Sequence, residues 1–244
     1  NKSFEFYKER FADASNFTFF FVGNFTNEEI KPFVEKYIAS LPAMHRKDGW
    51  RELGIEYPRG IIKKEVRRGV EPISQVRIAI TGEFDWNAQN NYDLQSLTSV
   101  ARIKLRELIR EDLGGTYGVR VSASGQKQPS ERFIFNVQFG CNPDRVDELV
   151  QSVFSVIDTL KAGPVDESYI VKVKETQRRE RETNLKDNEY WLNSLYNIYF
   201  TGRDLNDFYQ YEERIENLTA EDVYRAALKY LDTSNYIQVV LLPE

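Results

Sequence analysis

Residues 108–119 read LIREDLGGTYGV, and the fold can be worked out from this stretch in both directions. Upstream of it, apolar residues recur at the spacing of one helix face, at Leu94, Leu97, Ala101, Leu105 and Leu108. Gly114 and Gly115 end this helix, because glycine readily adopts the positive φ angle found just past a helix C-terminus. From Tyr117 onward apolar and polar residues alternate, which indicates a strand. The stretch therefore predicts a helix, a sharp turn and a strand, with Arg110 and Tyr117 at one corner of a sheet.

Arg110 and Tyr117 are both strong hydrogen-bond donors, but two interpretations of them are open. A guanidinium is always charged and carries five donors in a fixed fork, and a phenol adds one neutral donor. In the functional interpretation the two side chains bind a ligand. In the structural one, Arg110 complements the negative C-terminal end of its helix. Tyr117 then has the parity of Val119 and Val121 and lies on an apolar strand face.

The composition excludes several functional classes. The 244 residues are 41% hydrophobic, which is enough for a substantial core, and carry a net charge of −5. This charge gives no basic surface of the kind that binds nucleic acid. No apolar run approaches the length of a membrane-spanning helix. The single cysteine, Cys141, excludes an internal disulfide and leaves the cellular compartment open.

The single histidine, His45, argues against a zinc site in this chain. A catalytic zinc ion normally takes three protein ligands, most of them imidazoles. The chain has neither His-x-x-Glu-His nor His-Glu-x-x-His, and His45 stands in a polar segment. A Ser-His-Asp triad lacks the Gly-x-Ser-x-Gly turn that would hold its nucleophile. We therefore expect no metal ligands in this chain.

Strand and helix patterns alternate through the rest of the chain. Strands are predicted at residues 16–23, 61–68, 74–84, 117–124, 132–139 and 236–242. Helices are predicted at residues 4–13, 26–40, 87–113, 144–160, 166–186, 190–200 and 208–215, with a last helix from Thr219. Residues 16–23 are almost wholly apolar, so we expect a strand buried on both faces. The aromatic residues at 190–200 are interpreted as core residues.

The chain contains an internal echo, because residues 10–23 resemble residues 229–242 at a constant offset. Three pairs are identical: Asp13 and Asp232, Ser15 and Ser234, Asn16 and Asn235. A short match can arise by convergence on a helix–turn–strand, but it also suits a tandem duplication. In that interpretation residues 1–42 close a preceding repeat, 43–60 form a linker, and 61–244 are a later copy. We therefore expect the chain to be a fragment of a longer polypeptide.

The run from Arg110 to Val119 resembles the Arg…Tyr signature of the M16 (insulinase/pitrilysin-like) zinc metallopeptidases. Residues 7–42 are similar to the start of the family's C-terminal (M16_C) homology region, with Phe-Val-Gly-Asn at 21–24 and Ser-Leu-Pro at 40–42. The resemblance covers almost the whole chain. It implies an α+β fold with a mixed, largely antiparallel sheet backed by several helices, the LuxS/MPP-like metallohydrolase fold.

The resemblance also implies a division of the active site between two parts of a parent enzyme. The family's inverted zinc motif is absent, which implies a region C-terminal to the catalytic module, with zinc in the missing module. Residues 61–244 would then form a substrate-clamping domain. Arg110 would bind substrate carbonyls, and Tyr117 would bind substrate and stabilise the oxyanion. A positioned donor at such an oxyanion contributes roughly 3–4 kcal/mol. Gly114 and Gly115 would shape the turn.

The expected partners are a peptide substrate and the N-terminal zinc-bearing module of the same parent. The parent would be a zinc metallopeptidase, for which the bacterial periplasm is a suitable compartment, and the fragment alone would be inactive. Two alternatives stay open. M16-like folds also occur as inactive scaffold or partner subunits, and a generic α+β domain could match the signature by accident.

Overall fold

The computed structural model describes residues 2–46, 49, 51–68, 71–112 and 118–244, and at residues 110–112 it describes the backbone alone. Two compact units are formed. Unit 1 comprises the residues up to Ile55 together with Glu182–Asp204, and unit 2 comprises Glu56–Arg181 and Leu205–Glu244.

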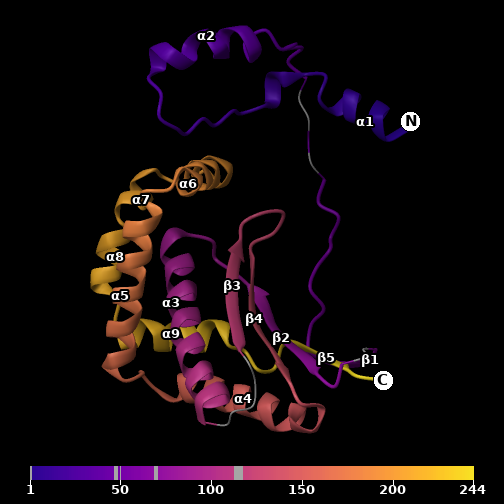
Figure 1. Cartoon of the computed structure of the whole chain (residues 1–244), viewed down its shortest axis with the longest axis vertical. Helices are drawn as coiled ribbons and strands as arrows, with labels where there is room; N and C mark the ends of the chain where they lie inside the picture. Colours follow the sequence, from indigo (N-terminus) through magenta and orange to yellow (C-terminus); the bar gives the residue numbers. More distant parts are fainter. Residues whose placement is uncertain (1, 47–48, 50, 69–70, 113–117) are drawn as a thin grey trace. The chain divides into compact units, whose positions relative to one another are not determined.

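Unit 2 is built on a sheet of five described strands in the order β1-β5-β2-β4-β3. Their bounds are β1 Ile61–Arg67, β2 Ser74–Glu83, β3 Val119–Gln126, β4 Arg132–Cys141 and β5 Tyr236–Leu242. Strands β1 and β5 are parallel, and the other neighbours are antiparallel. The last strand in sequence, β5, therefore lies between β1 and β2 inside the sheet (Figure 1). The predicted mixed, largely antiparallel sheet is confirmed.

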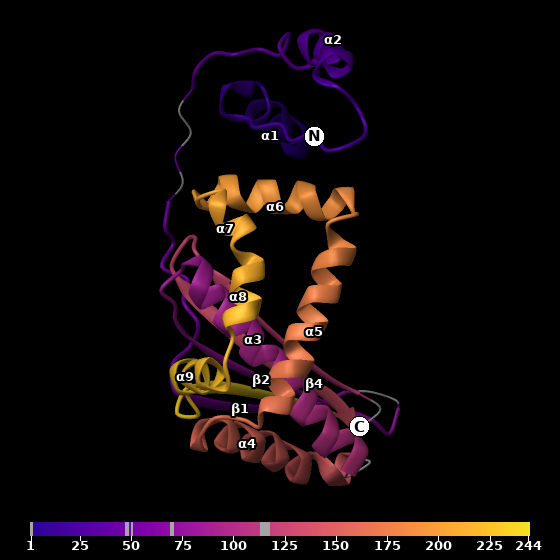
Figure 2. The ribbon, with the colours of Figure 1, turned by 90° about the vertical axis from the view of Figure 1, so that its left-hand side faces the viewer.

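The helices of unit 2 begin and end close to their predicted bounds. They are α3 Ala88–Leu105, η2 Arg106–Asp112, η3 Pro143–Arg145, α4 Val146–Ala162, α5 Glu167–Asn184, α7 Asn206–Tyr209, α8 Tyr211–Asn217 and α9 Ala220–Tyr230. The last residues of α5 belong to unit 1. In Figures 1 and 2, α3, α4 and α9 lie against the same face of the sheet. This arrangement confirms the α+β fold class.

The core lies between that sheet face and the three helices. Alternate residues of β2 and β4 point into it and are buried: Val76, Ile78, Ile80, Phe135, Val137 and Phe139. They meet the buried stripes of α3 and α4, including Leu97 and Val153. The other residues of these strands point away from the helices. The sheet thus has one apolar, helix-covered face and one face that bears polar side chains.

Unit 1 contains α1 Lys2–Arg10, η1 Ala14–Asn16, α2 Asn27–Tyr37 and α6 Asn188–Thr201. The predicted capping box at the start of α2 is confirmed: Thr26 Oγ1 accepts a hydrogen bond from Glu29 N, and the Glu29 carboxylate accepts one from Thr26 N. The equivalent box at Thr219 and Asp222 starts α9. Local sequence signals therefore position these helix starts.

The predicted buried strand at residues 16–23 is wrong for this structure. Residues 17–22 form neither helix nor strand, and Phe17, Phe19 and Phe21 are exposed. A strand needs neighbouring strands to satisfy its backbone N–H and C=O groups. Among the described residues of unit 1 no strand is present to do this. The apolar pattern therefore marks side chains that the described part of unit 1 leaves exposed.

The expectation that the aromatic residues at 190–200 form core is wrong for three of them, while Tyr190 and Trp191 are half-buried. Tyr196, Tyr199 and Phe200 on α6 are all exposed. Phe20 packs edge-on against Tyr196 and Tyr199, with ring centroids 6.1 and 5.6 Å apart. One side chain from an irregular segment cannot cover this aromatic face, which explains its exposure.

Candidate functional site

The predicted site lies where the helix that contains α3 gives way to β3. The helix does not stop at Leu105 but continues into η2, which is π-helical over Arg106–Asp112. Ile109 is fully buried and anchors this segment to the core. π-Helical turns are rare and frequently mark functional sites. The backbone of Arg110 therefore lies in a segment with an unusual hydrogen-bond pattern.

The four predicted site residues lie at the edge of the described residues or beyond it. The side chain of Arg110 and the whole of Gly114, Gly115 and Tyr117 lie outside the described residues. Their roles remain predictions. The described residues on either side show which contacts hold η2 and β3.

A carboxylate on η2 connects this segment to α5. Glu107 accepts a hydrogen bond from the Tyr169 hydroxyl at 2.7 Å and lies 3.5 Å from Lys172 Nζ. Lys104 lies over the Tyr169 ring, 4.5 Å from its centroid. The bond to the Glu107 carboxylate favours the neutral phenol and raises the pKa of Tyr169 to about 12. These contacts were not predicted, because Glu107 and Tyr169 are far apart in sequence and belong to no common motif.

Two side chains of α3 connect that helix to β3. Arg102 donates from Nε and Nη2 to the carbonyl oxygen of Val121, at 3.3 and 3.1 Å. About two turns earlier, Gln95 Nε2 donates to the carbonyl oxygen of Ala123 at 2.9 Å. Strand β3 is therefore bonded to α3 at two positions along the helix. Such a scaffold can hold two donors at a set separation.

The face of the sheet that points away from the helices carries a polar row next to this corner. Arg120 on β3 lies opposite Gln138 on β4, and Gln138 lies opposite Arg77 on β2. All three side chains are exposed. Arg77 donates from Nε and Nη2 to Asn136 Oδ1, at 3.2 and 3.0 Å, which ties its guanidinium to β4. Guanidinium and amide groups bind peptide carbonyls, so the row can extend a binding surface from the corner.

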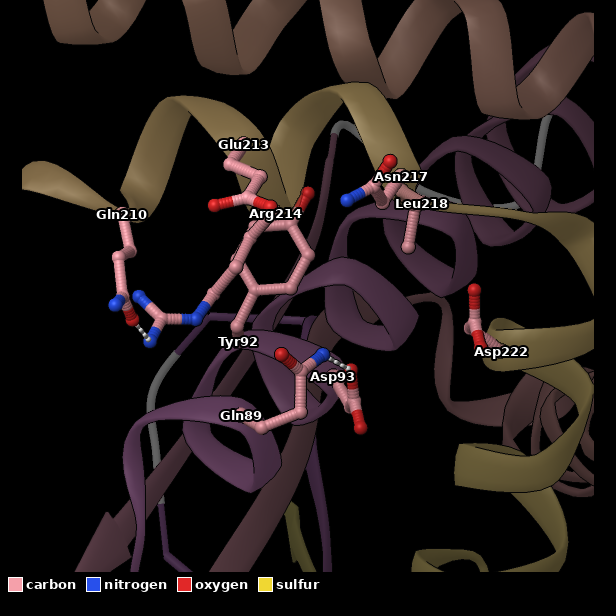
Figure 3. Close-up of a pocket in the computed structure, with 9 residues that line it drawn as sticks. All are labelled: Gln89, Tyr92, Asp93, Gln210, Glu213, Arg214, Asn217, Leu218 and Asp222. Atoms are coloured by element: carbon pink, nitrogen blue, oxygen red, sulfur yellow. Dashed lines mark hydrogen bonds between the residues drawn. The ribbon is translucent and has the colours of Figure 1, made fainter. Parts of the chain in front are cut away.

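A cavity of ≈ 440 Å³ lies on the helical side of unit 2 (Figure 3). Its lining residues come from α3, from the α7–α8 region and from α9: Gln89, Tyr92, Asp93, Gln210, Glu213, Arg214, Asn217, Leu218 and Asp222. Burial raises the pKa of Asp93, which accepts a hydrogen bond from Gln89 Nε2 at 2.8 Å. The Tyr92 hydroxyl donates to Gln177 Oε1 at 2.8 Å. These bonds join neighbouring helix turns and pairs of helices, so we assign the cavity a structural role.

The described ranges offer neither a metal site nor a membrane-spanning helix. They contain no group of three or more His, Cys, Asp or Glu side chains that could hold a metal ion. No helix within the part of the chain that the structure describes has both the length and the apolar character needed to cross a membrane.

The sequence model of the family described as "Peptidase M16 inactive domain" matches residues 2–177. The chain therefore belongs to the M16 peptidase family, in the C-terminal region that this description covers. This confirms the family resemblance.

Known relatives agree with this assignment. The chain is 26% identical over 195 residues to a probable zinc protease PqqL of Haemophilus influenzae, a match that covers 76% of this chain and 21% of the relative. The crystal structure of the periplasmic protease PqqL of Escherichia coli superposes with a TM-score of 0.75 at 21% identity, over 91% of this chain and 25% of that one. An M16 inactive domain from Pseudomonas fluorescens gives a TM-score of 0.68 at 17% identity, over 91% and 52%. The chain thus spans about a fifth of the curated relative it matches.

Proposed function

We propose that this chain is the substrate-holding, non-catalytic half of an M16-type zinc metalloendopeptidase. The family match over residues 2–177 carries the proposal. A sequence with one histidine does not offer the imidazoles of a usual catalytic zinc site, so the zinc belongs to another domain of the parent. That N-terminal domain is then the main partner of this chain.

In this proposal Tyr117 and Arg110 act on the peptide from the side opposite the metal. A zinc ion in another domain of the parent would activate a water for attack on the peptide, and negative charge would then develop on the scissile carbonyl oxygen. The Tyr117 hydroxyl donates a hydrogen bond to that oxyanion, and the Arg110 guanidinium binds a substrate carbonyl. Two contacts near Arg110 and Tyr117 support this proposal. The bond between Glu107 and Tyr169 holds η2, and the bond from Arg102 to Val121 holds β3.

The polar row on the open sheet face offers a second surface for the peptide backbone, on the side of the sheet opposite the helices. A peptide in extended conformation presents a carbonyl group on each side about every second residue. Arg120, Gln138 and Arg77 offer donors on three adjacent strands, starting three residues after Tyr117. We assign them to backbone binding, which makes few demands on the substrate's side chains.

The experiment is Tyr117→Phe in the intact parent enzyme, assayed with an unfolded peptide substrate. Removing one oxyanion donor lowers kcat by about 10²–10³-fold. Tyr209→Phe is the matched control, because Tyr209 is a solvent-exposed tyrosine on α7, and it is expected to retain full activity. Unchanged turnover by the Tyr117→Phe variant would remove the assigned role. The 244-residue chain alone is expected to hydrolyse no peptide, with or without added zinc.

An inactive scaffold or partner subunit is the second candidate, and the family's own description as an inactive domain favours it. The two candidates differ in the zinc-bearing half of the parent. An intact inverted zinc motif upstream supports the enzyme, and a degenerate one supports the scaffold. For the compartment we propose the bacterial periplasm, because the similar Escherichia coli PqqL is described as a periplasmic protease.

A further inference from the structure

The turn before β5 occurs a second time, in unit 1. In unit 2 the Asp232 carboxylate accepts hydrogen bonds from Ser234 N at 2.9 Å and from Ser234 Oγ at 2.7 Å. In unit 1 the Asp13 carboxylate accepts the same two bonds from the backbone and hydroxyl of Ser15. We call each of these an Asp-Ser turn. The echo in the sequence is therefore also an echo in local structure.

In unit 1 the Asp-Ser turn holds the chain that follows α2. Both oxygens of the Asp13 carboxylate accept backbone hydrogen bonds, Oδ1 from Met44 N at 2.9 Å and Oδ2 from Arg46 N at 2.8 Å. Between them, His45 N donates to Ser15 Oγ at 2.8 Å, and His45 has a φ of 57°, in the left-handed region. Successive N–H groups that converge in this way form a nest, a backbone concavity that binds anions. The Asp13 carboxylate is the anion in this nest.

Further bonds join the same two segments on either side of the nest. Ala14 N donates to Pro42 O at 2.8 Å, and Asn16 Nδ2 donates to Arg46 O at 2.8 Å. The Arg46 guanidinium donates from Nη1 to the carbonyl oxygen of Glu9 at 3.1 Å. Glu9 belongs to the last turn of α1, where a positive charge is favourable. The chain is therefore held from Pro42 to Arg46.

The burial of Asp13 makes this hold firm. Asp13 is only 1% exposed. Hydrogen bonds from Ser15, and then from the backbones of Arg46 and Met44, hold the pKa of its carboxyl group well below the usual range. The group is therefore ionised at neutral pH, and both of its oxygens accept hydrogen bonds. A buried carboxylate that lost these donors would be unfavourable, so the two segments separate only at a cost.

In unit 2 the second Asp-Ser turn holds the residue that precedes β1. Asn235, which follows the serine of this turn, accepts a hydrogen bond from Gly60 N at 2.7 Å, and Tyr236 N donates to Gly60 O at 3.2 Å. Asn235 also donates to Thr81 O at 2.6 Å, which ties the turn to β2. Gly60 has a φ of 83°, in the left-handed region like that of His45. Each turn thus bonds to a segment that contains a residue of positive φ.

We propose that the Asp-Ser turn is a clasp used twice, which holds the two ends of the connecting segment predicted at residues 43–60. The clasp of unit 1 holds this segment as far as Arg46, and the clasp of unit 2 holds it at Gly60. The length of chain between the clasps is therefore set by residues 47–59. Residues 43–46, if released, would add about 14 Å to the reach of the connection. This inference does not depend on the proposed function.

Hydrogen exchange in the intact parent polypeptide tests each clasp by a substitution in its own turn. Asp13→Ala removes the acceptor of the amides of Met44 and Arg46, which should then exchange at least about 10-fold faster, whereas the amide of Gly60 should be unchanged. Asn235→Ala is the reciprocal variant. It should speed exchange at Gly60 by at least about 10-fold and leave Met44 and Arg46 unchanged. A variant that changes both ends equally, or neither end, overturns the proposal.

Cleavage by trypsin gives a second readout of the clasp in unit 1. Trypsin cleaves after Arg46 and after Arg51, and Arg51 is exposed in an irregular segment. Proteolysis follows the population of the opened chain, so Asp13→Ala should speed cleavage after Arg46 by about 10-fold or more. Cleavage after Arg51 is the internal control and should keep its rate. An unchanged rate after Arg46 would overturn the clasp.

A milder variant decides the matter if Asp13→Ala unfolds unit 1 as a whole. General unfolding would also speed exchange at Glu29, whose amide donates to Thr26 Oγ1 at the start of α2. Ser15→Ala removes the acceptor of His45 N and leaves the Asp13 carboxylate in place. Faster exchange at His45 with unchanged exchange at Glu29 supports the clasp. Unchanged exchange at His45, or equal acceleration at both amides, overturns it.

Discussion

The hydrogen bond between Tyr169 and Glu107 gives a direct test of how the predicted corner is held. It is 2.7 Å long and joins a neutral hydroxyl to a carboxylate. Hydrogen bonds to charged groups contribute about 1.5–3 kcal/mol. The Glu107 side chain is 35% exposed, so solvent weakens the bond and we expect about 1–1.5 kcal/mol. Tyr169→Phe should lower the stability of unit 2 by this amount.

A double-mutant cycle with Tyr169→Phe and Glu107→Gln isolates the pair. The free energy of unfolding is best taken from hydrogen exchange at the buried α3 amides of Leu97 and Val100, because the chain has two units and a global signal would mix them. We expect a coupling energy of about 1 kcal/mol. Lys172→Met is the control, because its ion pair with Glu107 is solvent-exposed and contributes less than about 1 kcal/mol.

The pH dependence gives the same test a second signature. The folded-state pKa of Tyr169 lies above its ordinary value, so the folded state favours the neutral phenol. The stabilisation is fully present below about pH 10 and is lost as the pH rises through about 12. A coupling energy of zero at neutral pH would show that this bond does not hold η2, and the argument for a rigid corner would fail.

Three further predictions concern the sheet and the cavity. Asn235→Ala removes both bonds at the entrance to β5, which should cost about 1–2 kcal/mol and speed hydrogen exchange in β5. Gly125→Ala places a Cβ against the ring of Phe84 and should lower the free energy of urea unfolding by about 1–3 kcal/mol. Gly163→Ala is the control: its Cβ meets no atom within 4 Å, so its cost should be far smaller. Asp93→Asn should raise the free energy of unfolding at pH 7, because burial raises the folded-state pKa of Asp93 and disfavours its ionised form. The gain should vanish below about pH 4, where the carboxyl group is neutral in both states. A gain that persists there would contradict the assignment.

The sequence was enough to assign the predicted site residues to a helix end and a strand start. It was not enough to predict the contacts that bring these elements together. Helical spacing up to Leu108 and alternation after Tyr117 correctly predicted α3 and β3 on either side of the turn. The contacts that position the turn join residues with no sequence relation, such as Glu107 and Tyr169. Side-chain pairing across elements depends on how helices pack, and a one-dimensional pattern carries no such information.

The two wrong expectations have a common physical cause. Residues 16–23 and the aromatic residues of α6 are apolar enough to be buried, and the sequence correctly marks them as such. Hydrophobicity shows that a surface must be covered but does not identify what covers it. Among the described residues of unit 1, no element covers these side chains, so they are exposed.

The amino-acid sequence by itself determined the local elements: the periodicities of α3 and α4, the β3–β4 hairpin and the capping boxes, together with the family signature. These depend on interactions between residues close in the chain. Only the tertiary structure placed β5 between β1 and β2, brought Glu107 to Tyr169 and left residues 17–22 without a sheet. The physical reason is that a strand obtains its hydrogen bonds from neighbours distant in sequence, so the identity of those neighbours is decided only when the whole sheet assembles.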